Sequence, residues 1–197
     1  MVAVNELSFQ VRFHGPFRVG TGRGRDGVDA AIDLDDPLPA SHLKGLMRAS
    51  ARALLPPVDP LLDQVFGAGR DRGNSPWAWD SAHPASGSWR EMTVRNTVRI
   101  SIDDDCGTAV PDHLLVGAQL WPDVGLRATF SITRAGAVPA AALPRHEAML
   151  RLAARATTAL GAQRRRGLGW ITIRPDDGDD RERATADVRL ALGREVV

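Results

Sequence analysis

A proline, a serine and a lysine stand close together in the segment LPASHLKGLMR, at residues 38–48. Ser41 has a side chain suited to capping a helix, and Lys44 would then fall in the first helical turn. A helix N-terminus carries partial positive charge and free N–H groups, so a cation beside it favours phosphate binding. Taken alone, the segment is more simply explained as an ordinary capped helix with one exposed lysine.

A second basic segment, ALGAQRRRGLGW, precedes an apolar strand-like stretch at residues 159–170. Its chemistry-bearing residues are Arg164, Arg165, Arg166, Gly167 and Gly169. Arginine forks onto phosphate oxygens, and glycine lets a backbone approach a bulky ligand closely. A helix-to-strand turn with a solvated basic run explains the segment equally well.

A glycine-rich acidic loop, VGTGRGRDGVDAAIDLDD, covers residues 19–36 and holds Asp26, Asp29, Asp33 and Asp35. RNA is cut by its own 2′-hydroxyl when a protein positions the backbone and stabilises the developing charge. A divalent ion held by a carboxylate and by phosphate oxygens supplies that stabilisation. The simpler explanation is that the aspartates keep a loop solvated.

Two histidines near these segments are candidate general bases, since histidine titrates near neutral pH. His14 follows the first predicted strand and His42 lies in the first predicted helical turn. A surface histidine without chemistry is the simpler interpretation of each. Cys106 is the single cysteine, which excludes an internal disulfide framework and a cysteine-built zinc site.

The composition is that of a globular protein: 197 residues, 43% hydrophobic and 25% charged, which predicts one domain over residues 1–197. No apolar run is long enough to span a bilayer, and the first residues lack a signal-peptide pattern. We therefore expect a cytoplasmic protein without membrane contact. The net charge is +1, and the lack of tyrosine and the 5% of aromatic residues argue against a broad base-stacking platform.

Alternating and helical patterns predict the elements that position these residues. Helical spacing predicts helices from Ser41 to just before Pro56 and from Leu143 to Gly161, and residues 56–91 are expected to be an irregular insertion. Alternation predicts strands at 4–13, 92–102, 114–121, 126–134, 169–174 and about 185–192.

Reduced to its core, this order is β-α-β-β-α-β, an α+β ferredoxin-like arrangement shared with RNA-recognition domains. The insertion covers about 56–113 and includes a β-hairpin with its tip near 103–113. In this fold the two basic segments could lie along one edge of the sheet.

Several segments resemble, in consistent order, the RAMP superfamily proteins of CRISPR systems. LPASHLKGLMR resembles the family's Pro-Gly-Ser-Ser-Leu-Lys-Gly segment, with Ala40 and His42 in place of glycine and the second serine. GAQRRRGLGWITI resembles its glycine-rich C-terminal loop. QVFGAG with SPWAWDSA resembles its Phe-Gly and Asp-Ala elements, and VRNTVRISIDDDCGTAVPDHLLVGAQLW resembles the stretch with its thumb-like hairpin.

The resemblance is to the backbone subunit of type III effectors, which binds guide CRISPR RNA and cuts complementary target RNA. It implies that Asp29 is catalytic and holds a divalent ion, Mg²⁺ or Mn²⁺. Asp26 is the main alternative for the catalytic position, and Asp33 is another. It implies further partners, namely other RAMP subunits and copies of the same chain. The implied RNA-binding residues are Ser41, His42, Lys44, Arg48, Arg164, Arg165, Arg166, Gly167 and Gly169.

Three alternatives stay open at this point. One is a non-catalytic RAMP subunit of the same complexes. Another is a metal-independent endonuclease that processes guide RNA with His14 or His42. The third is a ferredoxin-like domain that binds a small anionic metabolite.

Overall fold

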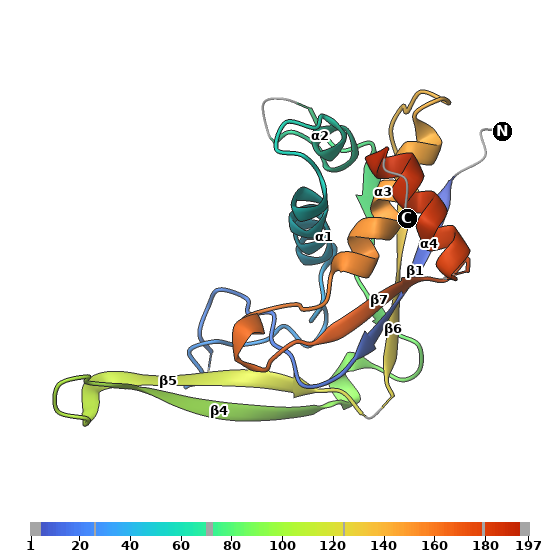
Figure 1. The fold of residues 1–197 in the computed structure, drawn as a ribbon. Helices are drawn as coiled ribbons and strands as arrows, with labels where there is room; N and C mark the ends of the chain where they lie inside the picture. Colours follow the sequence, from blue (N-terminus) through green and yellow to red (C-terminus); the bar gives the residue numbers. More distant parts are fainter. Residues whose placement is uncertain (1–4, 26, 70–72, 124, 179, 194–197) are drawn as a thin grey trace.

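The computed structural model describes residues 5–25, 27–69, 73–123, 125–178 and 180–193 (Figure 1). Its central sheet has the strand order β2-β6-β1-β7, and all neighbouring strands are antiparallel. The core elements in chain order are β1 (Glu6–Phe13), α1 (Ala40–Leu54), β2 (Trp77–Trp79), β6 (Arg127–Arg134), α3 (Leu143–Ala156) and β7 (Ile171–Pro175). This is the predicted ferredoxin-like β-α-β-β-α-β arrangement.

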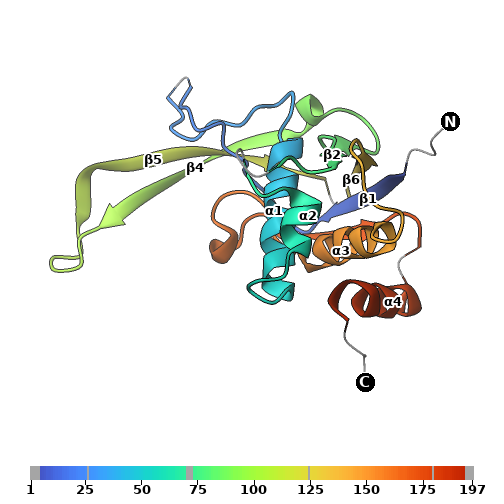
Figure 2. The same cartoon turned by 90° about the horizontal axis from the view of Figure 1, so that it is seen from above.

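The sheet buries one face and leaves the other polar. In β1 the buried residues are Leu7, Phe9, Val11 and Phe13, and the residues between them are wholly or partly exposed. Successive strand side chains point to opposite faces, so this alternation directs one row toward the helices. Figure 2 shows α1, α3 and the C-terminal helix α4 (Arg181–Leu192) on the same side of the sheet.

Helix α1 follows the predicted pattern, because it buries Leu43, Leu46, Met47 and Ala51 and ends at Leu54 before two prolines. Its predicted cap is wrong. The N-cap residue is Pro39, whose own side chain makes no capping hydrogen bond, and Ser41 is an exposed residue of the first turn. The second helix also ends earlier than predicted, at Ala156, and Gly161 follows in a separate left-handed turn.

Residues 56–91, which we expected to be irregular, contain α2 (Leu61–Phe66), β2, β3 (His83–Pro84) and a 3-10 turn at Trp89–Glu91. Trp77, Trp79 and Trp89 are buried and pack this segment onto the core. The second core strand is therefore β2, with only three residues, and it lies inside the supposed insertion. A strand of that length is too short to show a periodic pattern.

Strands β4 (Thr93–Ile102) and β5 (Ala109–Trp121) confirm the predicted hairpin, which forms a two-stranded sheet of its own. It projects away from the sheet and helices (Figures 1 and 2). The pairs Val98–Val116 and Ile100–Leu114 place apolar side chains on one of its faces, and most of them are exposed.

The predicted strand at 185–192 is wrong, because Arg181–Leu192 form helix α4. Asp180 caps this helix by accepting a hydrogen bond from the N–H of Arg183, and Gly193 ends it in a left-handed conformation. The helix packs on α3 through a buried carboxylate: Asp187 is 2.7 Å from Arg151 and 2.6 Å from Arg155. Across the described ranges, no helix has the length and apolar character that a membrane span requires.

Candidate functional site

The first turn of α1 is joined directly to the loop that follows α3. The ring of His42 accepts a hydrogen bond at Nε2 from the backbone N–H of Gly161, at 3.0 Å. Burial, and to a smaller extent the charge of Arg164, lowers the pKa of His42, so the imidazole is neutral and keeps its acceptor. The structure therefore brings together the two segments that the sequence singled out separately.

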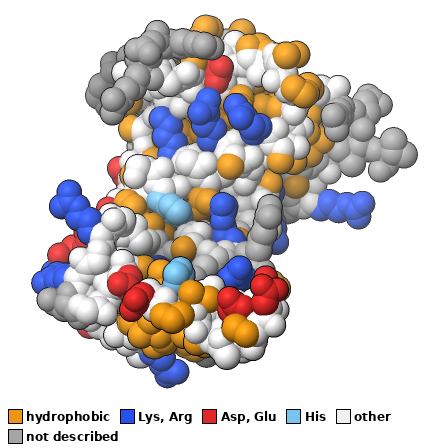
Figure 3. Space-filling view, turned by 90° about the vertical axis from the view of Figure 1, so that its left-hand side faces the viewer, with side chains coloured by type: hydrophobic (Ala, Val, Ile, Leu, Met, Phe, Trp, Pro, Cys, Tyr) orange, Lys and Arg blue, Asp and Glu red, His pale blue; other side chains and the backbone are white. Residues whose placement is uncertain are grey.

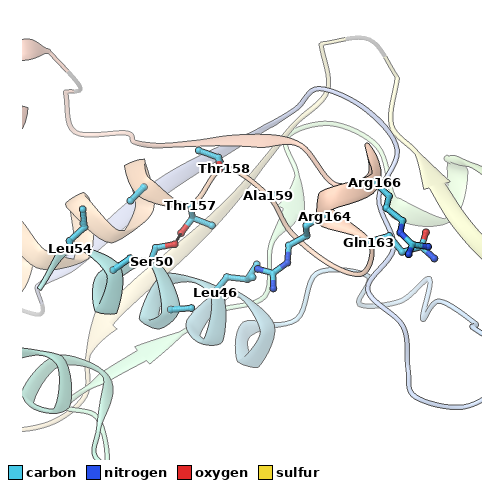
Figure 4. Close-up of a pocket in the computed structure, with 12 residues that line it drawn as sticks. Leu46, Ser50, Leu54, Thr157, Thr158, Ala159, Gln163, Arg164 and Arg166 are labelled. Atoms are coloured by element: carbon cyan, nitrogen blue, oxygen red, sulfur yellow. Dashed lines mark hydrogen bonds between the residues drawn. The ribbon is translucent and has the colours of Figure 1, made fainter. Parts of the chain in front are cut away.

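A second contact lies further along the same helix, where the hydroxyls of Ser50 and Thr157 are 2.8 Å apart. Between α1 and residues 156–166 lies an open hollow of about 750 Å³ (Figure 4). Its walls are mostly alanine, serine and threonine, with Leu46, Leu54 and Gln163, and the charged side chains at its end are Arg164 and Arg166. Figure 4 shows Arg164 extending toward α1 and Arg166 extending the other way. A phosphate entering this hollow would meet guanidinium groups at one end.

The three arginines form the 3-10 turn Arg164–Arg166, bracketed by Gln163 and Gly167 in left-handed conformations. The side chains of Arg164 and Arg166 are exposed. A Cβ on Gly169 would overlap the carbonyl of Leu160. Gly169 therefore allows the backbone at Leu160 to lie close to its own backbone. The sequence had suggested that this glycine makes room for a ligand.

The cations of α1 are partly engaged with neighbours. Lys44 is half-buried, with Nζ 5.1 Å from the centre of the Trp79 ring. Burial, followed by the charge of Arg48, lowers the pKa of Lys44. Arg48 donates to Asp63 at 2.9 Å. Figure 3 shows this side of the molecule, where basic side chains gather over the helical part and acidic and hydrophobic ones gather below it, where the hairpin projects.

Ser81 carries out the role that the sequence suggested for Ser41. Its hydroxyl accepts a hydrogen bond from the N–H of Ala40 at 3.2 Å and donates to Asp36 at 2.8 Å. Sequence reasoning missed this residue because it lies far along the chain from α1. The available signal was its place in SPWAWDSA, one of the segments that carried the family resemblance.

Asp29 lies against the hairpin, beside β5. Its backbone N–H donates to the carbonyl of Val116 at 2.9 Å, and its carboxylate Oδ2 accepts from the N–H of Val116 at 2.7 Å. The N–H of Ala118 donates to the carbonyl of Ala30 at 3.1 Å, so the loop runs along the hairpin edge. Asp29 is exposed, and no described residue forms a hydrogen bond with its other oxygen, Oδ1.

The remaining aspartates of the loop differ from Asp29. Asp26 lies outside the described residues. Asp33 accepts a hydrogen bond from the N–H of Asp35 at 2.9 Å, and Asp35 pairs with Arg90. Asp29 is thus the described aspartate of this loop that contacts the hairpin.

Within the described ranges, no group of three or more His, Cys, Asp or Glu side chains is arranged to hold a metal ion. The protein alone therefore offers one carboxylate with one available oxygen at this position. That donor set fits a hard cation which takes its other ligands from phosphate oxygens and water, as Mg²⁺ does in many phosphate-binding sites.

The two candidate histidines have different surroundings. His14 is exposed, and its Nε2 is 2.7 Å from the hydroxyl of Thr172 on β7. The Nε2 of His42 is already occupied by the N–H of Gly161. The arrangement gives His42 a role in joining two segments.

No protein-family profile matches this chain, and no curated protein matches its sequence. Among solved structures, it superposes on a chain of a type III-B Cmr-beta complex bound to cognate target RNA, determined by cryo-EM, with a TM-score of 0.58. The two chains share this fold. Their sequences are 15% identical over 87% of this chain and 59% of the Cmr complex chain, so this protein spans less than two thirds of that chain's length.

Proposed function

We propose that this protein is an RNA-binding subunit of a type III CRISPR effector complex. The observation that carries the proposal is the bond between His42 and Gly161, which joins the start of α1 to the arginine loop. The fold shared with a chain of an RNA-bound Cmr complex supports it. So does the family resemblance of the segments around Lys44 and Gly167.

The proposed ligand at the hollow between α1 and residues 156–166, which we call the groove, is the sugar–phosphate backbone. Arg164 and Arg166 supply forked donors, and alanine, serine and threonine make up most of the remaining lining. The described residues that line the hollow include no aromatic ring, so they offer no platform for base stacking. Contacts to phosphate position a strand without reading its sequence, which suits a guide RNA whose sequence varies.

The finer proposal is that the subunit cuts target RNA with Asp29. This carboxylate is exposed, anchored to the hairpin through Oδ2, and has Oδ1 available. A divalent ion, Mg²⁺ or Mn²⁺, bound there would stabilise negative charge on a phosphate. The chain's own contribution is to fix the position of the carboxylate beside the hairpin, since two hydrogen bonds to Val116 hold the loop there.

The proposed partners are guide RNA, target RNA, other RAMP subunits and further copies of this chain. The hairpin gives this a physical basis, because an isolated two-stranded hairpin is only marginally stable in water. Val98, Ile100 and Leu114 are each more than half exposed on its apolar face. A neighbour that covers this face would remove those side chains from water.

A non-catalytic subunit of the same complexes is the second candidate. It is favoured by the absence of a metal-binding cluster among the described side chains and by the bond that already occupies one oxygen of Asp29. The experiment that separates the two uses the full chain assembled with guide RNA and its partner subunits. Cutting of guide-matched RNA that stops with chelator supports catalysis, whereas tight binding without cutting supports the second candidate.

A further inference from the structure

Arg18 is an arginine that the fold buries to 4% exposure at the base of the hairpin. Its guanidinium lies over Gly117 of β5, where a Cβ would overlap it. Because residue 117 is a glycine without a side chain, the guanidinium of Arg18 has space to lie there. The backbone of Arg18 is fixed as well, since its carbonyl accepts the N–H of Ala162 at 2.8 Å.

This buried cation has no anionic partner among the described residues. On β4, Thr97 pairs with Gly117, and Arg99 lies two residues further along on the same face of the hairpin. The charge of Arg99 lowers the pKa of Arg18, after the larger effect of burial. Arg99 is half-buried, and no described carboxylate pairs with it either. Holding two positive charges close together in a partly buried site costs free energy, and an anion bound between or beside them offsets that cost.

The guanidinium of Arg18 is not completely closed off from solvent. The guanidinium nitrogens of Arg18 form no hydrogen bond with a described residue. They also differ from the unbonded polar atoms that are fully buried, such as Nη1 of Arg151. They therefore retain contact with solvent. The position is next to Asp29, because Gly117 pairs with Ala30 and Asp29 bonds to Val116. It also adjoins the arginine loop through Ala162.

We propose that Arg18 and Arg99 form a phosphate site at the hairpin base that holds the RNA backbone beside Asp29. The inference rests on the proposed RNA-binding function and names the contact that positions the strand for that loop. A phosphodiester suits two adjacent guanidinium groups, since each can donate two N–H groups to its oxygens. The site would extend the basic groove of Arg164 and Arg166 toward the hairpin.

The test compares Arg18→Met and Arg99→Met with Arg127→Met, a control that removes an exposed arginine from β6 on the open sheet face. Binding of single-stranded RNA by the full chain is measured against salt concentration. Each site variant should weaken binding several-fold and reduce the slope of log K on log salt by about 0.7, the value for one phosphate of a single strand. Arg127→Met should leave the slope unchanged.

A fourth variant, Gly117→Ala, keeps Arg18 but displaces its guanidinium, so it should reproduce the Arg18→Met defect. The wild-type protein should also gain thermal stability from inorganic sulfate, and Arg18→Met should lose that gain. Because the variant removes an unpaired buried cation, its melting temperature without sulfate should equal or exceed that of the wild type.

Wild-type salt slopes in both site variants would overturn the site while leaving the proposed function intact, provided that loss of the arginine loop still weakens binding. If the wild type bound no RNA, the proposed function would fail. The sulfate measurement would then decide whether Arg18 belongs to an anion site.

A lowered melting temperature in Arg18→Met with no sulfate effect in the wild type would show a packing role and overturn the site. Wild-type RNA binding in Arg18→Met with loss of subunit assembly would identify a partner's carboxylate as the ligand and also overturn it.

Discussion

The Nε2 atom of His42 and the backbone N–H of Gly161 form a 3.0 Å hydrogen bond that joins the first turn of α1 to the loop after α3. A Cβ on Gly161 would overlap the carbonyl of Arg18, so the same glycine also lets the loop lie against the segment that leads to the hairpin. Gly161 thereby connects the start of α1, the arginine loop and Arg18, the residue that precedes the acidic loop.

His42→Gln tests how far stability depends on this bond at different pH values. The folded pKa of His42 lies below its ordinary value of 6.5, so the unfolded chain binds a proton that the folded chain excludes. The contribution of His42 is therefore fully present above pH 6.5 and is lost as the pH falls below it. His146, with its pKa also lowered by burial, adds to the same decline.

In His42→Gln an amide replaces the titrating ring, so the free energy of unfolding should fall less steeply between pH 6.5 and pH 5. Denaturant titrations at each pH measure it. His146→Gln is the control for the other buried ring. A decline identical to that of the wild type in His42→Gln would contradict the assigned state of His42.

Asp29→Asn separates the charge of this residue from its role in holding the loop. The amide oxygen can still accept the N–H of Val116, so assembly and guide binding should remain within about twofold of wild type, while target cutting is lost. Asp29→Ala should also lose cutting and loosen the loop. Cutting is followed with labelled guide-matched RNA, with and without chelator.

The controls for this prediction are Asp26→Ala, Asp33→Ala and Asp35→Ala. If Asp26→Ala cuts no RNA while Asp29→Asn remains active, the cleavage residue is Asp26, and the family motif matches this loop a few residues earlier than we assigned it. If all variants cut at the wild-type rate, the acidic loop is not the active site. If the wild type cuts no guide-matched target, the non-catalytic subunit is the correct alternative.

Replacing Lys44, Arg164, Arg165 and Arg166 together with alanine should weaken RNA binding for all sequences alike. Phosphate contacts release counterions, so the dependence of binding on salt should flatten by about 0.7 for each contact that is lost. A matched control is Arg12→Ala with Arg127→Ala, which removes two exposed arginines that pair across the open sheet face. An unchanged salt slope in the quadruple variant would disprove the assignment of the groove.

Asp187→Asn should destabilise the protein, because Asp187 is 1% exposed and neutralises Arg151 and Arg155 from α4. Removing one member of a buried ion pair costs about 3–5 kcal/mol. Denaturant unfolding measures the loss, with Asp177→Asn as the control for the more exposed pair with Arg183. Equal stability of the two variants would show that α4 does not depend on the buried carboxylate.

Residues 96–113 should become protected from hydrogen exchange when the chain assembles with RNA and neighbouring subunits. In the free chain the described backbone pairs of the outer hairpin join only its own two strands, while the loop before α1 bonds to β5 nearer the base, at residues 116–120, so the outer backbone should open easily. The residues of β1 serve as the internal control, because they are paired on both sides within the sheet. Equal protection of the hairpin in the free and assembled protein would contradict its role as a contact surface.

The sequence predicted the long periodic elements of this fold and missed the short or electrostatically held ones. Helix α1 and strand β1 each have a continuous apolar pattern, which fixes both type and buried face. Strand β2 has three residues, too few for a pattern. The sequence predicted a strand in place of helix α4 because the two buried residues of this helix are a carboxylate, Asp187, and a small residue, Ala191, so large apolar residues do not mark its packed face.

The sequence predicted the segments that form the candidate site, but not the hydrogen bonds and contacts that join them. The arginine loop and the start of α1 were identified from residue types, and their proximity followed from the fold. The roles of Ser81 and Arg18 depend on contacts with Ala40 and Gly117, which lie far away in the sequence. Local composition cannot show that an arginine will be buried over a distant glycine.

The most direct test of the central claim is to sequence the RNA that co-purifies with the full-length protein from its native cells after ultraviolet cross-linking. We predict CRISPR repeat and spacer sequences, cross-linked to peptides that contain residues 42–48 and 161–169 and lost in the quadruple variant of Lys44 and the three arginines. Protein that carries no RNA, or RNA cross-linked equally to wild type and quadruple variant, would contradict the account.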